Sequence, residues 1–359
     1  MAHRYISTRQ FFLDLIKDYE PELTFKGKTR ADFQKWQKAF RPKFLECIGQ
    51  LPKRVPLDPD VQWEVEEDGM IKRKIYMDTA PFTTLPTILL VPKHAKGQKL
   101  PAVVAIHGHG SWGKDPVAGS KMPEHQTDIN YYQYDYGYQM AKRGYVAICP
   151  DMRPFGERSD HFQGEKPIVN RDPCNVHFIK GALLGFNLLS YNLWDLIRCV
   201  DYLETLPFVD KNRIGALGLS GGGSHVMHFA ALEPRIKVTD IICALNSYRG
   251  WGIGIDNFCG TQFVTGMFKY GDHAEICGLI APRPLLVEHG GFDYGFPLQH
   301  SASAVKAVEK IYKAAGVPDR FETDLGYCGH QFLANKCFGF FDKWLKADIS
   351  QTSDSVGSH

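Results

Sequence analysis

The stretch that most constrains the fold of this chain is residues 214–223, with the sequence Ile-Gly-Ala-Leu-Gly-Leu-Ser-Gly-Gly-Gly. A short apolar run leads to Ser220, and Gly218 and Gly222 lie two residues before and after it. This pattern is typical of a strand, a sharp turn and a helix. A serine held at positive φ on such a turn leaves no room for side chains at the two flanking positions, and glycine supplies that room. A serine that only capped a helix would not need glycine on both sides. We therefore interpret Ser220 as a nucleophile at the end of a buried strand.

The overall composition excludes several classes of partner. The chain has 359 residues, 44% of them hydrophobic, which suffices for one large domain with additions or for two small ones. Its 42 basic and 40 acidic residues give a net charge of +2, so no strong field favours nucleic acid or an anionic membrane. The first twelve residues lack the apolar core of a signal peptide, and no later segment has the length to cross a bilayer. We expect a cytoplasmic protein without nucleic-acid or membrane partners, and the sequence leaves its oligomeric state open.

The nine cysteines are scattered without Cys-x-x-Cys pairs, and we expect most of them to be buried small side chains. His107 and His109 lie two residues apart, a spacing that could suit a metal ion. No His-Glu-x-x-His motif or nearby carboxylate pair completes such a site. The sequence therefore predicts neither a metal nor an organic cofactor.

Hydrophobic periodicity divides the chain into three parts. Residues 1–55 contain helical patterns on both sides of Pro21, which predict a helical extension packed on the core. Residues 56–348 form the main domain, and residues 349–359 a loose polar tail. The main domain begins with three strand patterns at 61–65, 71–77 and 87–91, with a turn at Asp68-Gly69.

Strands and helices then alternate, which predicts an α/β fold with a mainly parallel, doubly wound sheet. The predicted strands are 101–106, 145–149, 214–219, 238–245, 284–288 and 321–325. The predicted helices lie within 133–143, 178–205, 221–232, 301–315 and 337–345. Segments 111–132 and 152–174 are predicted loops. The aromatic-rich segment 246–279 is too long for a simple connection, and we interpret it as a lid or pocket wall inserted in the domain.

A serine nucleophile needs a base, and the base needs a carboxylate that orients it. Because the carboxyl ends of parallel strands meet at one edge of a sheet, the partners are expected in the loops after strands. Asp293 follows the strand 284–288, and His330 follows the strand 321–325. We predict His330 as the base and Asp293 as its acid. Glu288 and Asp272 remain alternative acids, each more readily explained as structural.

The anionic oxygen of a tetrahedral intermediate needs two backbone donors. We assign these to the N–H groups of Gly221, which follows the nucleophile, and of His109, in the loop after the strand 101–106. The candidate substrate-pocket residues are Trp112, Trp251, Phe258 and Arg153. Arg153 has a second interpretation, in which it belongs to a structural salt-bridge network with Asp151 and Arg158. His225, His228 and His289 are interpreted as packing residues.

Several segments together resemble a known family. Residues 209–215 running into 218–222, the Ala-Pro-Arg-Pro-Leu-Leu run at 281–286, and the Asp293 and His330 loops are similar to the dienelactone-hydrolase-like and acetyl xylan esterase-like branch of the α/β-hydrolases. The order Ser220, Asp293, His330 matches the order of nucleophile, acid and histidine in that superfamily. Dienelactone hydrolases proper use a cysteine where this chain has Ser220, which argues against that activity.

The resemblance implies a serine carboxylic-ester hydrolase that forms an acyl-enzyme on short-acyl esters, such as acetyl groups on carbohydrates. Two other classes of function remain open. A peptidase or aminoacyl-releasing enzyme of the prolyl-oligopeptidase-like type would use the same triad, although no repeat here could build the propeller domain that such enzymes carry. The second open class is a catalytically silent binding module. Such a module would not require all three triad positions to be filled.

Overall fold

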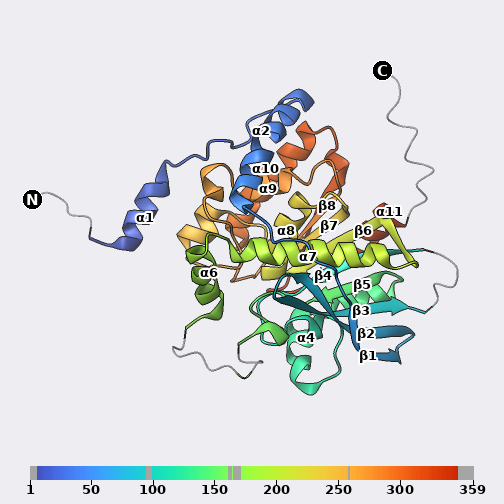
Figure 1. The fold of residues 1–359 in the computed structure, drawn as a ribbon. Helices are drawn as coiled ribbons and strands as arrows, with labels where there is room; N and C mark the ends of the chain where they lie inside the picture. Colours follow the sequence, from blue (N-terminus) through green and yellow to red (C-terminus); the bar gives the residue numbers. More distant parts are fainter. Residues whose placement is uncertain (1–5, 94–98, 161–163, 165–170, 258, 347–359) are drawn as a thin grey trace, which may run out of the picture.

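A single nine-stranded sheet forms the centre of the computed structural model (Figure 1), which describes residues 6–93, 99–160, 164, 171–257 and 259–346. The strands lie in the order β1-β2-β3-β5-β4-β6-β7-β8-β9. Their bounds are β1 Asp60–Glu67, β2 Met70–Ala80, β3 Thr83–Pro92, β4 Leu100–Ile106, β5 Val146–Pro150, β6 Val209–Leu219, β7 Ile236–Ile242, β8 Leu285–Gly290 and β9 Phe321–Gly326.

The sheet is antiparallel at one edge and parallel elsewhere. Strands β1, β2 and β3 pair antiparallel, and β3 pairs antiparallel with β5. From β5 through β4 to β9 every neighbouring pair is parallel. The β1–β2 turn falls at Asp68 and Gly69, both at positive φ (54° and 77°), as a tight two-residue hairpin turn requires. The predicted α/β fold and the antiparallel lead-in are therefore confirmed.

Helices cover both faces of the sheet. Their bounds are α1 Thr8–Lys17, α2 Arg30–Ile48, α3 Lys114–Val117, α4 Gln126–Tyr132, α5 Tyr136–Lys142, α6 Pro173–Leu183, α7 Leu188–Thr205, α8 Gly221–Leu232, α9 His273–Gly278, α10 Leu298–Ala314 and α11 Cys337–Leu345. Side chains of β4 alternate between two cores: Ala102, Val104 and Ile106 face the one that holds α7 and α8, whereas Val103 and Ala105 face the one that holds α5 and α11. This period-two alternation is why the strand is apolar throughout.

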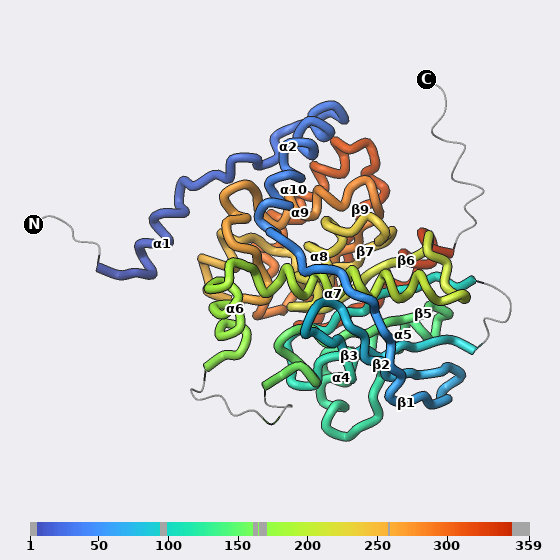
Figure 2. The backbone as a smooth tube through the Cα atoms, in the orientation of Figure 1, coloured from blue at the N-terminus to red at the C-terminus, as the bar shows by residue number. Residues whose placement is uncertain are grey.

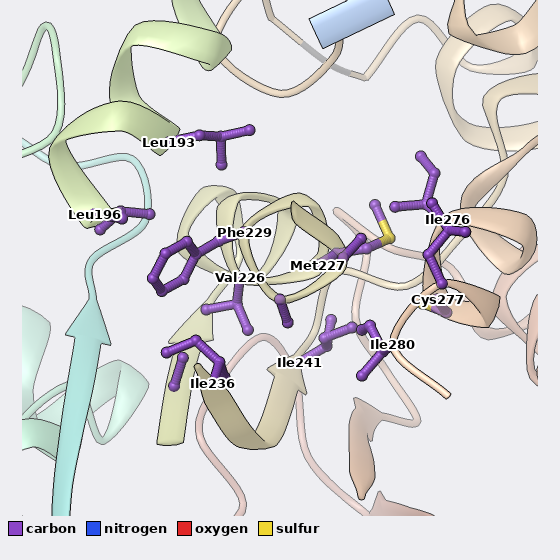
Figure 3. Packing of buried hydrophobic residues seen from close by; sticks show 14 of the residues in the cluster. Leu193, Leu196, Val226, Met227, Phe229, Ile236, Ile241, Ile276, Cys277 and Ile280 are labelled. Atoms are coloured by element: carbon purple, nitrogen blue, oxygen red, sulfur yellow. The ribbon is translucent and has the colours of Figure 1, made fainter. Parts of the chain in front are cut away.

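Helix α8, which begins directly after Ser220, lies deep in the first core. Figure 3 shows its Val226, Met227 and Phe229 between Leu193 and Leu196 of α7, strand β7, and the segment containing Ile276. All three side chains are fully buried. The start of α8 is thus fixed by packing along the helix.

The N-terminal extension contributes to the same core through α2. Thr29 and Asp32 cap the start of α2 reciprocally, and the side chains of Phe40 and Phe44 are completely buried. Arg41 donates hydrogen bonds to the carbonyl oxygens of Ala231, in the last turn of α8, and of Leu279 (both 3.2 Å). Helix α1 lies at the periphery of the molecule in Figures 1 and 2, where Arg9 donates a hydrogen bond to the carbonyl oxygen of Gly254 (2.9 Å) and Arg249 donates one to that of Lys17 (3.2 Å).

Three segments contain helices that differ from those expected from the sequence. The predicted loop 111–132 contains α3, the short 3-10 helix Pro123–His125 and α4. The helical pattern in 178–205 is divided between α6 and α7. Segment 246–279 holds the π-helix η3 (Tyr248–Gly254), the 3-10 helix η4 (Met267–Lys269) and α9. Two further 3-10 helices are η2 (Gly156–Arg158) and η5 (Pro318–Arg320).

Among the helices in the described ranges, none has the length and apolarity to span a membrane.

Candidate active site

Ser220 lies on a strained turn between β6 and α8, with φ 62° and ψ −123°. A Cβ atom added to Gly222 would lie 2.0 Å from the carbonyl oxygen of Ile106, and one added to Gly218 would lie 2.7 Å from that of Gly222. The loop after β4 approaches equally closely, because a Cβ on Gly108 would lie 2.9 Å from the Cβ of Ser220. Glycine is therefore required where β4 and β6 bring the two loops together.

Asp293 and His330 form a hydrogen-bonded pair at the ends of β8 and β9. The Nδ1 atom of His330 lies 2.7 Å from Oδ2 of Asp293. The other carboxylate oxygen of Asp293 accepts hydrogen bonds from the backbone N–H groups of Gly295 (2.8 Å) and Phe296 (2.9 Å). Burial opposes ionisation of this carboxylate, but the imidazole and the two amides outweigh it and lower the pKa of Asp293. The carboxylate thus stays ionised and holds one ring nitrogen of His330.

Ser220 and His330 line the same cavity, which has a volume of about 370 Å³. Within the described part of the chain no hydrogen bond joins the hydroxyl of Ser220 to the imidazole. Hydrogen bonds between catalytic groups are often loose without substrate, so the shared cavity is the relevant observation. The full lining is His109, Tyr132, Tyr134, Leu219, Ser220, Trp251, Asp256, Asn257, Cys259, Gln262, Tyr294, Gly295, Phe296 and His330.

The imidazole of His330 is the first of three stacked rings. The ring of Phe296 stacks on His330 (centroids 5.6 Å apart, 6° between planes) and also on Trp251 (4.8 Å, 21°). The indole N–H of Trp251 donates to the carbonyl oxygen of Gly295 (2.9 Å) and so ties segment 246–279 to the Asp293 loop. Trp251 therefore helps to orient His330 as well as lining the cavity.

The two predicted oxyanion donors lie side by side. Gly221 is the first residue of α8, whose initial N–H groups have no partner within the helix. A Cβ atom on Gly221 would lie 3.5 Å from the backbone nitrogen of His109. The N–H of Gly108 is already used, because it donates to the hydroxyl of Tyr134 (2.5 Å). His109 is therefore the next residue of this loop whose N–H can face the nucleophile.

The side chain of His109 contacts a pair of thiols. Its Nε2 atom lies 2.8 Å from Sγ of Cys259, and its ring packs edge-on against Phe155. A hydrogen bond from Cys174, followed by the contact with His109, lowers the pKa of Cys259. Although burial opposes the charge, the contact with Cys259 raises the pKa of His109. Sequence spacing alone does not reveal this cluster.

Of the four candidate pocket residues, the structure places one in the cavity lining. Trp251 lines the cavity, whereas Trp112 and Arg153 are absent from its lining. The ring of Trp112 packs on His125 (4.8 Å). Arg153 forms a salt bridge with buried Asp195, which also binds Arg158 (2.6 Å). The fourth candidate, residue 258, lies outside the described residues.

The structure also places the rival acids and histidines. Glu288 is buried in β8, and Asp272 caps α9. Burial lowers the pKa of His107, of His225 to about 3, of His228 to about 4 and of His289 to about 4. These imidazoles are neutral groups in the core. The alternative in which His107 and His109 share a metal ion is not supported by their contacts, because His107 Nε2 accepts a hydrogen bond from the N–H of Met152 (2.8 Å).

Sequence reasoning missed most of the aromatic and amide lining. The missed residues are Tyr132, Tyr134, Asn257, Gln262, Tyr294 and Phe296. Their only sequence signal is position. Tyr132 ends the predicted loop 111–132 and Tyr134 lies two residues beyond it, two others come from segment 246–279, and two come from the Asp293 loop.

Comparisons with known proteins identify the family of the chain and show similar folds. Residues 1–332 match the Abhydrolase family. The "Putative hydrolase YtaP" of Bacillus subtilis is 25% identical over 310 residues, covering 85% of this chain and 98% of that protein. The "4-O-methyl-glucuronoyl methylesterase 1" of Wolfiporia cocos is 25% identical over 231 residues, 55% of each chain. Among solved structures, a "putative acetyl xylan esterase" from Bacteroides fragilis has a TM-score of 0.73 at 20% identity, covering 90% of this chain and 83% of its own. A glucuronoyl esterase from Solibacter usitatus has a TM-score of 0.64 at 15% identity, and the match covers 87% of this chain and 93% of that one.

Proposed function

The chain belongs to the α/β-hydrolase family, and we propose that it is a serine carboxylic-ester hydrolase acting on short-acyl esters of carbohydrates. The observation that carries the proposal is the hydrogen-bonded pair of Asp293 and His330. His330 lines the same cavity as Ser220, which lies on a strained turn. A serine, a histidine and a carboxylate in these positions match the requirements of acyl transfer.

In the proposed reaction, the Nε2 atom of His330 removes the proton of the Ser220 hydroxyl as its oxygen attacks the ester carbonyl. The carboxylate of Asp293 stabilises the imidazolium that forms. The N–H groups of Gly221 and His109 bind the anionic oxygen of the tetrahedral intermediate. The leaving alcohol takes its proton from His330. Water, activated by the same imidazole, then releases the acid from the acyl-enzyme.

The cavity lining supports a polar, ring-shaped alcohol as the leaving group. The aromatic rings of Tyr132 and Tyr294 offer flat apolar faces, while Asn257 and Gln262 offer amide groups that can bind hydroxyls. At about 370 Å³ the cavity has the size of a small-ligand site. The names of the relatives, glucuronoyl methylesterase and acetyl xylan esterase among them, add support for a carbohydrate ester.

The decisive test is Ser220→Ala. We expect hydrolysis of p-nitrophenyl acetate to fall by at least about 10⁴-fold with the melting temperature nearly unchanged, because the nucleophile is removed from a position that tolerates a small side chain. A fluorophosphonate probe should label wild-type Ser220 and leave the variant unlabelled. Ser303→Ala, at an exposed position on α10, is the control and should retain full activity. Wild-type turnover by Ser220→Ala would refute the proposal.

A substrate panel separates the remaining possibilities. Acetylated xylo-oligosaccharides, methyl esters of glucuronic acid and amino-acyl p-nitroanilides should be compared by kcat/KM. The proposal predicts that acetylated sugars are the best substrates, and preferential cleavage of the anilide would favour the peptidase alternative.

The cytoplasmic location expected from the sequence stays a prediction.

A further inference from the structure

Three side chains with metal-binding atoms converge at the wall of the cavity. They are His109, in the loop after β4, Cys174, in the first turn of α6, and Cys259, between η3 and η4. The Nε2 atom of His109 and the two Sγ atoms all lie within 4.8 Å of one another. Both cysteines are free and buried, with 2% and 9% of their surfaces exposed. Segments far apart in the sequence thus present one imidazole and two thiols to a common point.

The spacing of these atoms is close to what a tetrahedral zinc ion needs. Zn–S bonds of about 2.3 Å and Zn–N bonds of about 2.0–2.1 Å place two sulfurs about 3.8 Å apart and nitrogen and sulfur about 3.5 Å apart. The Nε2–Sγ distance between His109 and Cys259 is 2.8 Å. It must therefore open by about 0.7 Å, which rotation of the Cys259 side chain can supply.

We propose that His109, Cys174 and Cys259 bind one Zn²⁺ ion at the edge of the cavity. Two thiolates and an imidazole are the donor set that zinc prefers, and they exclude hard ions such as Mg²⁺ and Ca²⁺. His109 and Cys259 line the cavity, whereas Cys174 is absent from its lining. The fourth coordination position therefore faces the cavity and takes a water molecule or an oxygen of the substrate. This site departs from the sequence-based expectation that no metal is bound.

Neighbouring groups already hold two of the ligands in place. The hydroxyl of Thr261 lies 3.1 Å from Sγ of Cys259. The carboxylate of Asp172 accepts the backbone N–H of Cys174 (3.0 Å) and so fixes the first turn of α6. Such outer contacts orient metal ligands and are part of the affinity of a built site.

Occupancy of this site would also fix the imidazole of His109. A metal ion on Nε2 leaves the ring proton on Nδ1. A Cβ atom on Gly221 would lie 2.8 Å from that Nδ1 atom, so the ring N–H is held against the first residue of α8. Zinc would thereby connect α6, the β4 loop and segment 246–279 next to the predicted oxyanion donors.

Other clusters in the described residues do not support the same inference. The cluster of Cys243, Asp293 and His330 contains the hydrogen-bonded acid and histidine already described. Asp240, Glu288 and Cys337 are all buried and absent from the cavity lining, and Oε2 of Glu288 accepts the N–H of Leu333 (2.7 Å), so we interpret this group as structural.

The test measures metal binding itself and is independent of ester hydrolysis. The full chain, stripped with a chelator and reduced, is titrated with Zn²⁺ in competition with a chromophoric chelator. We expect one ion per chain and a higher melting temperature with zinc. Co²⁺ in place of zinc should give the near-ultraviolet charge-transfer band of thiolate ligands and the visible bands of a tetrahedral complex.

Variants identify the ligands. Cys174→Ser, Cys259→Ser and His109→Gln should each weaken binding by at least about 100-fold. Cys328→Ser is the matched control, because this half-buried cysteine lies near His330 outside the cluster, and it should bind zinc as the wild type does. Absence of a stoichiometric ion, a cobalt complex without the thiolate band, or unchanged binding in the cysteine variants would each overturn the proposal.

Discussion

At the scale of single residues, the most informative group is the carboxylate of Asp293. It accepts hydrogen bonds at both oxygens, from two backbone amides on one side and from His330 on the other. These donors keep it ionised in spite of its burial. The consequence for the imidazole is a fixed tautomer, with the proton on Nδ1 and a free electron pair on Nε2.

Asp293→Asn should therefore reduce kcat by roughly 10³–10⁴-fold while the fold is retained. The asparagine oxygen can still accept the amides of Gly295 and Phe296, but its NH₂ group now donates to Nδ1 of His330. The ring proton then moves to Nε2, where it blocks removal of the serine proton. Steady-state kinetics with a p-nitrophenyl ester measures the loss, and circular dichroism checks the fold. A decrease in kcat of less than tenfold would mean that Asp293 is not the orienting acid.

The placement of the three predicted triad residues beyond strand ends could be predicted from sequence, because each follows a strand pattern within a few residues. Their catalytic roles stay a prediction. Ser220, Asp293 and His330 come after buried runs whose ends must meet at one sheet edge. Trp112 was less predictable, because its direction depends on how a loop folds. The convergence of Cys174 and Cys259 on His109 could not be predicted, since it depends on the packing of three distant segments.

At the scale of elements, the periodicity of strands and long helices was a good guide and the short helices were not. The strand 321–326 and the helix 337–345 agree with their predicted ranges almost to the residue. Helices α3 and α4 have four and seven residues, too few for a helical period to be visible. They form because tertiary contacts, such as those of the fully buried Lys114 with Asp151 and Glu157, fix the segment in place.

Two glycine substitutions test how tightly the elbow is packed. Gly222→Ala should destabilise the protein by at least about 1–3 kcal/mol and abolish activity, because the added methyl group collides with backbone where β4 meets α8. Gly339→Ala is the matched control within α11, where a Cβ meets nothing within 4 Å. It should stabilise the protein by about 0.5–1 kcal/mol, since alanine favours a helix interior. Denaturant unfolding measures both, and equal stabilities of the two variants would contradict this account of the elbow.

At the scale of the whole molecule, stability should depend on pH through a buried pair of acids. Asp240 of β7 and Glu288 of β8 are fully buried and have carboxyl oxygens within 4.8 Å of each other. Burial raises the pKa of both carboxyl groups above their ordinary values, and the charge of Asp240 raises the pKa of Glu288 further. The folded state therefore retains protons that the unfolded chain has lost. The contribution of this pair to stability is complete below about pH 4 and is lost as the pH rises toward the raised pKa values.

Asp240→Asn should consequently gain stability relative to the wild type as the pH rises from 5 to 9. One of the two acids is replaced by a neutral amide, so the remaining carboxylate no longer faces a second charge. Free energies of unfolding measured across this range check the trend. Asp319→Asn, at an exposed position, is the control and should show no such pH-dependent gain. A constant difference between Asp240→Asn and the wild type would exclude the buried pair as the cause.

The hydrogen bonds from Arg41 to Ala231, in the last turn of α8, and to Leu279, at the end of α9, bear on where this protein can be shortened. A chain starting at residue 56, the first residue of the main domain in the sequence-based division, would lack this guanidinium and both buried phenylalanines of α2. The helix that begins at Gly221 would then lose its support at the opposite end. We expect such a truncation to impair hydrolysis, even though none of the removed residues that the structure describes, 6–55, lines the cavity. The N-terminal extension would then hold the nucleophile in position from a distance.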